Sequence, residues 1–205
     1  MVRHTGPVRW RPSLLPALLL ACATPLAACG GDDAQLVGYQ LEPATDVSDL
    51  SLPDAATGEP VAMTAADGEL MLMYFGYTAC PDVCPTTLAS VRSALRKLGD
   101  GAERIGLAMA TVDPARDTAD VLPGYVQSFL PDAVGLRTED PDELQQVADR
   151  FGATYSVTGS GDDTEVTHSG ALFVVDDTGT VIDVLPFGVT PDDIRNDLEI
   201  LLESA

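Results

Sequence analysis

The spacing of hydrophobic positions changes several times along the chain, and each change predicts an element of secondary structure. The continuous apolar run Leu70–Phe75 has the length of a strand that is buried on both faces. We expect residues 80–84 to form a loop after it, because Pro85 is then free to occupy the first position of a helix. Apolar residues recur at helical spacing from Pro85 to Leu98, and Gly99 ends the pattern.

Similar patterns predict the remaining elements. Strands are expected over residues 47–52, 61–63, 104–112, 134–136, 170–175 and 180–185, and helices over residues 119–129, 140–151 and 190–201. The acidic segment Thr158–Glu165 is expected to be a flexible loop. A βαβ unit that is followed by a hairpin and a helix predicts a thioredoxin-like (peroxiredoxin-like) α/β sandwich. Its central mixed β-sheet is flanked by helices and preceded by an N-terminal strand extension.

The first residues have the pattern of an export signal. A basic start and a short apolar stretch lead to Leu26-Ala27-Ala28-Cys29, where small residues precede a cysteine. This sequence resembles the lipobox of bacterial lipoproteins, which implies lipid on Cys29; an ordinary signal peptide is the alternative. We therefore expect a lipoprotein signal peptide over residues 1–28, a tether over residues 29–40 and one domain over residues 41–205. The domain is expected outside the cytoplasm, anchored to the bacterial cell membrane.

The charge and the cysteine content of the chain limit the range of possible functions. The 205-residue chain has 32 acidic and 11 basic residues, a formal net charge of −21, which disfavours nucleic acid as a partner. Once the signal peptide and the lipidated cysteine are set aside, only Cys80 and Cys84 remain as thiols. A disulfide between them would close too short a loop to stabilise the fold strongly, so the pair is expected to serve chemistry. The N-terminus of the following helix is expected to lower both thiol pKa values.

Three segments resemble the SCO/SenC proteins, thioredoxin relatives that handle copper during cytochrome c oxidase assembly. They are residues 75–85 (Phe-Gly-Tyr-Thr-Ala-Cys-Pro-Asp-Val-Cys-Pro), residues 111–118 (Thr-Val-Asp-Pro-Ala-Arg-Asp-Thr), and His168-Ser169 with the strand that follows. The likeness implies that Cys80, Cys84 and His168 bind one copper ion, as Cu(I) or Cu(II), and that Cys80 and Cys84 also form a disulfide. Thiolates are soft ligands suited to Cu(I), and imidazole suits both oxidation states.

The resemblance also implies the partners. The first is the cytochrome c oxidase subunit that carries the copper A site. The domain would deliver copper to this site, reduce its cysteines, or do both. The second is another copper chaperone or a thiol reductase. We expect a monomeric metallochaperone domain rather than an enzyme.

Other interpretations stay open. A thiol–disulfide oxidoreductase would use Cys80 and Cys84 on partner cysteines without a stored metal, and His168 would then be an ordinary hydrogen-bonded histidine. The acidic residues near the motifs either cap local structure or orient the loop; these are Asp82, Asp113 and Asp117. The methionines in apolar runs are expected in the core; these are Met63, Met71, Met73 and Met109.

Overall fold

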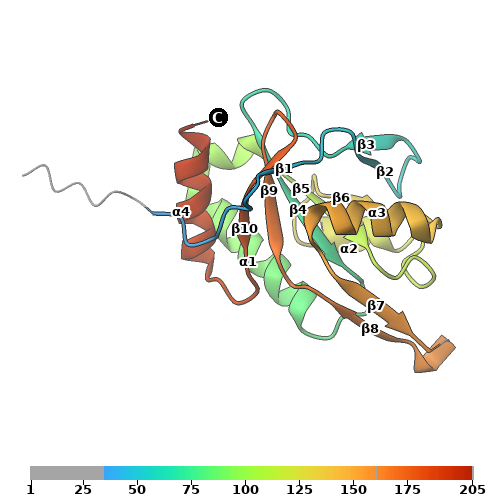
Figure 1. Ribbon diagram of the computed structural model, residues 1–205. Coiled ribbons are helices and arrows are strands. Elements are labelled where there is room, and N and C mark those ends of the chain that lie inside the picture. Colours follow the sequence, from blue (N-terminus) through green and yellow to red (C-terminus); the bar gives the residue numbers. More distant parts are fainter. Residues whose placement is uncertain (1–34, 160, 205) are drawn as a thin grey trace, which may run out of the picture. The chain divides into compact units, whose positions relative to one another are not determined.

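One central sheet holds most of the strands, in the order β1-β10-β9-β4-β5-β6 (Figure 1). The computed structural model describes residues 35–159 and 161–204; the predicted signal peptide and Cys29 lie outside them. The strands of this sheet are β1 (Thr45–Asp46), β4 (Leu70–Gly76), β5 (Ile105–Thr111), β6 (Val134–Leu136), β9 (Leu172–Val175) and β10 (Thr180–Leu185). β4 and β6 each pair in parallel with β5, whereas β9 runs antiparallel to both β4 and β10. The sheet is therefore mixed, as predicted.

Helices cover both faces of this sheet. They are α1 (Val83–Leu98), α2 (Leu122–Gln127), α3 (Pro141–Phe151) and α4 (Pro191–Leu202), with the short 3-10 helices η1 (Gly99–Arg104) and η2 (Gly161–Asp163). Neighbouring residues of a strand point to opposite faces. Tyr74 of β4 lies against Cys84 of α1, and Phe75 packs edge-on against Phe151 of α3 with ring centroids 5.5 Å apart. The sequence therefore predicts the α/β sandwich correctly. No helix in the described part of the chain is long and apolar enough to cross a bilayer.

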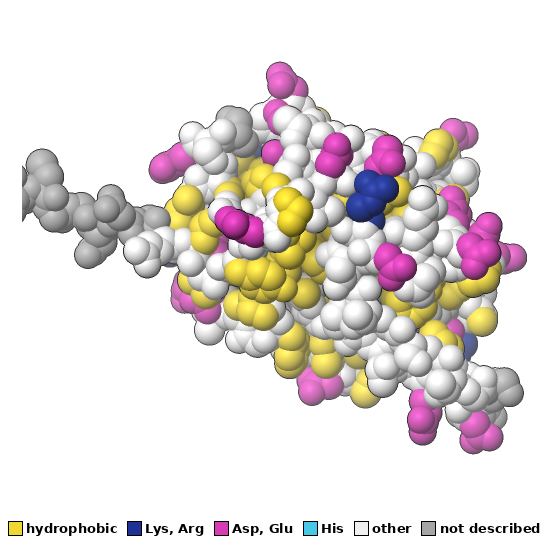
Figure 2. All heavy atoms as spheres, in the orientation of Figure 1, with side chains coloured by type: hydrophobic (Ala, Val, Ile, Leu, Met, Phe, Trp, Pro, Cys, Tyr) yellow, Lys and Arg dark blue, Asp and Glu magenta, His cyan; other side chains and the backbone are white. Residues whose placement is uncertain are grey.

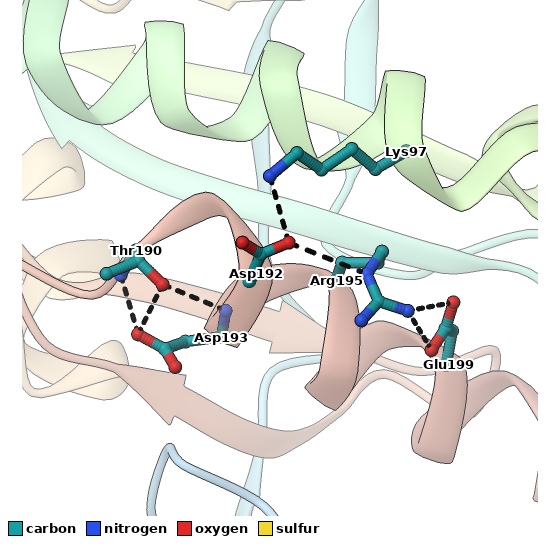
Figure 3. Close-up of polar contacts among 6 residues, drawn as sticks. All are labelled: Lys97, Thr190, Asp192, Asp193, Arg195 and Glu199. Carbon is teal, nitrogen blue, oxygen red and sulfur yellow. Dashed lines mark hydrogen bonds and ion pairs between the residues drawn. The ribbon is translucent and has the colours of Figure 1, made fainter.

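Helix α4 begins with a capping box and lies beside α1. The Thr190 hydroxyl accepts a bond from the Asp193 amide, and the Asp193 carboxylate accepts one from the Thr190 amide at 2.7 Å (Figure 3). These bonds satisfy two amides that the helix leaves without intrahelical acceptors. Lys97 of α1 donates to Asp192 at 2.9 Å and so links the two helices.

The core is mainly aliphatic, and aromatic and methionine side chains pack within it. Phe173 of β9 packs edge-on against both Phe75 and Phe151, with centroids 6.1 and 5.4 Å apart. The four methionines that were expected in the core are all buried there: Met63, Met71, Met73 and Met109. Acidic side chains, in contrast, are scattered over the surface, and few basic ones appear on the face that Figure 2 shows.

The strand predicted over residues 47–52 is wrong. β1 ends at Asp46, and β2 (Ser51–Pro53) instead pairs with β3 (Pro60–Ala62) in a separate two-stranded sheet. Val47 lies between the two strands, fully buried, with its amide bonded to the Gly179 carbonyl at 2.8 Å. The apolar residues of this segment thus face the core from a bend in the chain, which hydrophobicity alone does not distinguish from a strand.

The flexible loop predicted over residues 158–165 is only the tip of a β-hairpin. β7 (Tyr155–Thr158) and β8 (Glu165–His168) are antiparallel, with Tyr155 opposite His168. The hairpin projects away from the central sheet (Figure 1). Tyr155 and Val157 alternate with polar residues, but each strand is only four residues long and its side chains are exposed or half-buried, so the strand signal in this sequence is weak.

A buried carboxylate lies beneath the first described residues. Asp183 of β10 has no exposed surface, and its oxygens have no hydrogen-bond partner among the described residues. Burial, together with the neighbouring Asp197 carboxylate, raises the pKa of Asp183 to about 7. Asp197 accepts bonds from the amides of Val37 and Gly38 at 2.7 to 3.0 Å. The segment around Gly38 is therefore held against a carboxyl group that keeps its proton close to neutral pH.

We expect the free energy of unfolding to fall as the pH rises from about 4 to about 8. Over this interval the folded chain keeps a proton on Asp183 that the unfolded chain, with an ordinary carboxyl pKa, has released. Asp183→Asn keeps this position neutral and should flatten the slope. Urea titrations at several pH values measure how the free energy of unfolding changes with pH. Asp120→Asn, at an exposed position, is the control. Equal slopes for wild type and Asp183→Asn would contradict the assignment.

Candidate metal centre

The junction of β4 and α1 places both cysteines at the end of a buried strand. A Cβ at Gly76, the last residue of β4, would lie 2.9 Å from the Cys84 sulfur, so glycine is what permits the helix to start this close. The helix begins at Val83 and not at Pro85, which corrects the predicted boundary. Proline is tolerated at this third position because the first amides of a helix have no intrahelical acceptor. Cys84 therefore lies in the first helical turn, and Cys80 in the loop before it.

His168 reaches the two thiols from the end of β8. Its Nε2 lies 3.3 Å from Cys84 Sγ and 3.8 Å from Cys80 Sγ, and the three ligand atoms all lie within 4.8 Å of one another. Its Nδ1 lies 3.0 Å from the Ser169 carbonyl oxygen, which accepts a bond from the Nδ1–H tautomer. The lone pair of Nε2 then faces the sulfurs, as a metal ligand requires. The structure thus brings together the three residues that were predicted to bind metal.

Two tyrosines hold the imidazole in place. The rings of Tyr74 and Tyr77 meet His168 edge-on, with centroids 6.0 and 5.7 Å away. The Tyr77 hydroxyl also donates to the Val166 carbonyl at 3.4 Å, which joins the cysteine loop to β8. Sequence reasoning did not single out these tyrosines, because aromatic residues in and after a buried strand are expected simply to pack.

The two thiols differ in acidity. Burial disfavours the Cys80 thiolate, but hydrogen bonds from the Cys84 and Asp82 amides, together with the adjacent His168 side chain, outweigh burial and lower the pKa of Cys80 to about 7. Burial raises the pKa of Cys84 to about 12, and the adjacent Cys80 sulfur adds to the rise. The predicted effect of the helix N-terminus is confirmed for Cys80 and wrong for Cys84, whose side chain has no exposed surface. Cys80 is therefore the thiol that ionises first.

Asp117 anchors the cysteine loop. Its buried carboxylate accepts bonds from the Thr78 amide at 2.9 Å, the Thr78 hydroxyl at 2.5 Å and the Thr111 hydroxyl at 2.6 Å. Thr78 belongs to the loop and Thr111 ends β5, so one carboxylate ties the loop to the sheet. Of the roles considered from the sequence, orientation of the loop is the one that this geometry supports.

The other two acidic residues of the motifs have local roles. Asp113 is buried and forms an ion pair with Arg116. Asp82 occupies the N-cap position of α1, but its side chain makes no capping bond and instead accepts one from the Thr86 hydroxyl at 3.2 Å. Neither belongs to the cluster of candidate metal ligands in the described part of the chain.

No disulfide joins the two cysteines in this structure. Cys80 and Cys84 are both free thiols, and the Cys84 amide donates to the Cys80 sulfur at 3.3 Å. The oxidised pair stays a prediction.

A thioredoxin-like sandwich with two cysteines at its first helix and a histidine facing them is the fold and site of a thioredoxin-like protein with a candidate metal centre. The chain belongs to the SCO1/SenC family, whose sequence model matches residues 42–203. It is 33% identical over 177 residues to a protein of Stutzerimonas stutzeri, a match that covers 83% of this chain and 84% of that protein. It is 35% identical over 115 residues to the SCO2-like protein of Rickettsia prowazekii, covering 55% of this chain and 56% of that protein. The match thus spans little more than half of the Rickettsia protein.

Solved structures agree with this assignment. Apo Sco1 from Thermus thermophilus superposes with a TM-score of 0.70 and 28% identity, over 83% of this chain and 99% of that one. ScoI from Bradyrhizobium japonicum, solved with copper bound, gives a TM-score of 0.62 and 32% identity over 74% of this chain and 96% of that one. ScoI from Arabidopsis thaliana, also solved with copper bound, gives a TM-score of 0.68 and 26% identity over 76% of this chain and 97% of that one.

Proposed function

We propose that this chain binds one copper ion through Cys80, Cys84 and His168 and delivers it during assembly of cytochrome c oxidase. The observation that carries the proposal is the convergence of two sulfurs and one imidazole nitrogen within 4.8 Å. Two thiolates and an imidazole form a soft donor set that suits copper better than magnesium or calcium. Copper bound in two relatives from the same family supports the choice of metal.

The donor set suits a cargo that must be released. Three protein ligands leave the metal open on one side, whereas a structural zinc site closes with four. His168 comes from a projecting hairpin, so a small displacement of β8 would remove one ligand without disturbing the other two. We propose that the copper A site of the oxidase accepts the copper, because the family serves the assembly of this enzyme. The domain would donate the copper as a monomer.

Copper titration of the reduced chain tests the copper site. Wild type should bind one equivalent of Cu(I) and one of Cu(II). His168→Ala removes a neutral donor, so Cu(I) should persist on the two sulfurs with affinity lowered about tenfold or more, and Cu(II) should be lost or change its absorption. Thr167→Ala, on the same strand, is the matched control. Should His168→Ala bind both oxidation states as tightly as wild type, the copper function is wrong.

Reduction of a disulfide between cysteines of a partner protein is a second candidate function, and the acidity of the Cys80 thiol favours it. A thiol with a pKa near the ambient pH is the best attacking group in disulfide exchange, and Cys80 has a pKa of about 7. Cys84, in the adjacent turn, would resolve the mixed disulfide and leave a Cys80–Cys84 disulfide in the oxidised chain. This activity does not need His168. Retained exchange in His168→Ala together with unchanged copper binding would replace the copper function with this one.

We further propose that the mature protein is anchored outside the cytoplasm through lipid on Cys29. The sequence Leu26-Ala27-Ala28-Cys29 supports this location. Cys29→Ser removes the acceptor for the lipid, so the protein should move from the membrane fraction to the soluble fraction. Cell fractionation followed by mass determination of the mature N-terminus measures this change, with Cys22→Ser as the control. Wild-type protein recovered mainly as a soluble chain without lipid would disprove the anchor.

A further inference from the structure

A cavity of about 460 Å³ opens at the end of α1 that is remote from Cys84. It lies between the last turns of α1, the start of β5 and the loop after α2. Its walls are largely apolar and come from Leu95, Ile105, Leu107, Phe129 and Leu130. The volume falls within the range of roughly 300–1,000 Å³ that is usual for small-molecule sites, which combine apolar walls with a few polar groups.

Besides Asp132, the charged groups that line this cavity are two arginines without an ion-pair partner among the described residues. Arg92 and Arg96 of α1 both line it, and neither forms a salt bridge with any described residue. The other basic side chains of the described chain all bond to carboxylates or backbone carbonyls: Lys97, Arg104, Arg116, Arg137, Arg150 and Arg195. Figure 3 shows two of these paired residues, Lys97 and Arg195. The two unpaired cations thus lie in one cavity of a strongly acidic chain.

The placement of the two arginines is unfavourable for the helix by itself. They are four residues apart, so like charges face each other on one side of α1, an arrangement that destabilises a helix. The negative end of the helix dipole offsets this for Arg96 in the last turn, but Arg92 lies a turn earlier. The Arg92 guanidinium lies 5.9 Å from the centre of the Phe129 ring, and its buried Nε–H has no acceptor among the described residues. No hydrogen bond at Nε therefore prevents this group from turning toward an anion.

We infer that the cavity binds a carboxylate with an apolar tail, such as a medium-chain fatty acid. Arginine presents a planar fork of N–H donors that matches a carboxylate in two parallel bonds. A carboxylate between Arg92 and Arg96 would supply the missing negative charge, and its tail would cover the apolar wall that includes Phe129. Asp132 also lines the cavity and would repel the head group, which places the carboxylate on the arginine side. This site is separate from the metal centre, at the other end of the same helix.

Isothermal titration of the full chain with sodium dodecanoate, below its micelle concentration, tests the inference. We expect one binding site per chain, with affinity at least about tenfold above that for dodecyltrimethylammonium, which has the same tail and the opposite charge. Acetate, which has the head group without the tail, should bind far more weakly. Copper stoichiometry serves as an independent measure that the fold is intact.

Variants assign the binding to the two arginines. Arg92→Gln and Arg96→Gln should each weaken dodecanoate binding about tenfold, because each removes a charged hydrogen-bond donor. Asp132→Asn should strengthen it several-fold, and Arg150→Gln, whose arginine pairs with Asp49 elsewhere, should leave it unchanged. Arg92→Lys restores charge but not the fork and should restore part of the affinity, which separates a lost contact from a lost fold. Absent binding, equal affinity for the cationic amphiphile, or unchanged affinity in both glutamine variants would overturn the inference.

Discussion

A chain that carries Cys84→Ala should lose stoichiometric copper binding. Cys84 supplies a charged sulfur donor that lies 3.3 Å from His168 Nε2, and no other described thiol besides Cys80 can replace it. One thiolate and one imidazole cannot hold Cu(I) as tightly as the full donor set, so we expect the affinity to fall by at least about a thousandfold. Competition of the reduced protein with a Cu(I) chelator measures the loss. Cys80→Ala should have a similar effect.

The control for this experiment separates the lost ligand from the lost packing. Cys84 has no exposed surface, so its truncation also removes some buried contacts. Val91→Ala truncates another fully buried residue of α1 beyond the metal centre and should cost about 1–3 kcal/mol of stability. It should bind copper like wild type. Full copper binding by Cys84→Ala would remove this residue from the ligand set.

Asp117→Ala should destabilise the chain and weaken copper binding at the same time. Removing the carboxylate leaves the amide and hydroxyl of Thr78 and the hydroxyl of Thr111 without acceptors inside the protein. We expect a loss of about 3–5 kcal/mol, because each buried polar group left without a partner costs about 1–3 kcal/mol. Because Thr78 belongs to the loop that carries Cys80, the affinity for Cu(I) should fall as well, by about tenfold or more. Chemical unfolding and chelator competition measure the two effects.

Asp120→Ala serves as the comparison for Asp117→Ala. It removes an exposed carboxylate from the same segment and should change neither quantity. Asp117→Asn keeps the size of the side chain and one acceptor oxygen, so its loss of stability should be smaller than that of Asp117→Ala. If Asp117→Ala is as stable as wild type, the carboxylate does not anchor the loop.

Local patterns in the sequence determined the strand, loop and helix that surround the candidate site. The apolar run Leu70–Phe75 predicts a buried strand, the glycine after it ends the strand, and the prolines around Cys80 and Cys84 require a loop before a helix. Each of these signals acts within a few residues, because apolar runs, glycine and proline restrict the chain where they stand. The same reasoning misplaced the start of α1, since proline is acceptable anywhere in the first turn.

The tertiary structure alone decided how the parts of the site meet. His168 stands 88 residues after Cys80, and the β7–β8 hairpin that brings it to the thiols has two short strands with exposed or half-buried side chains and only a weak apolar pattern. Its predicted role as a ligand came from resemblance to a family and not from spacing. The acidity of the two thiols also depends on packing, because burial of Cys84 outweighs its place in the first turn of a helix. Ligand types follow from the residues themselves, whereas ligand distances and pKa values follow from long-range contacts that only the folded chain makes.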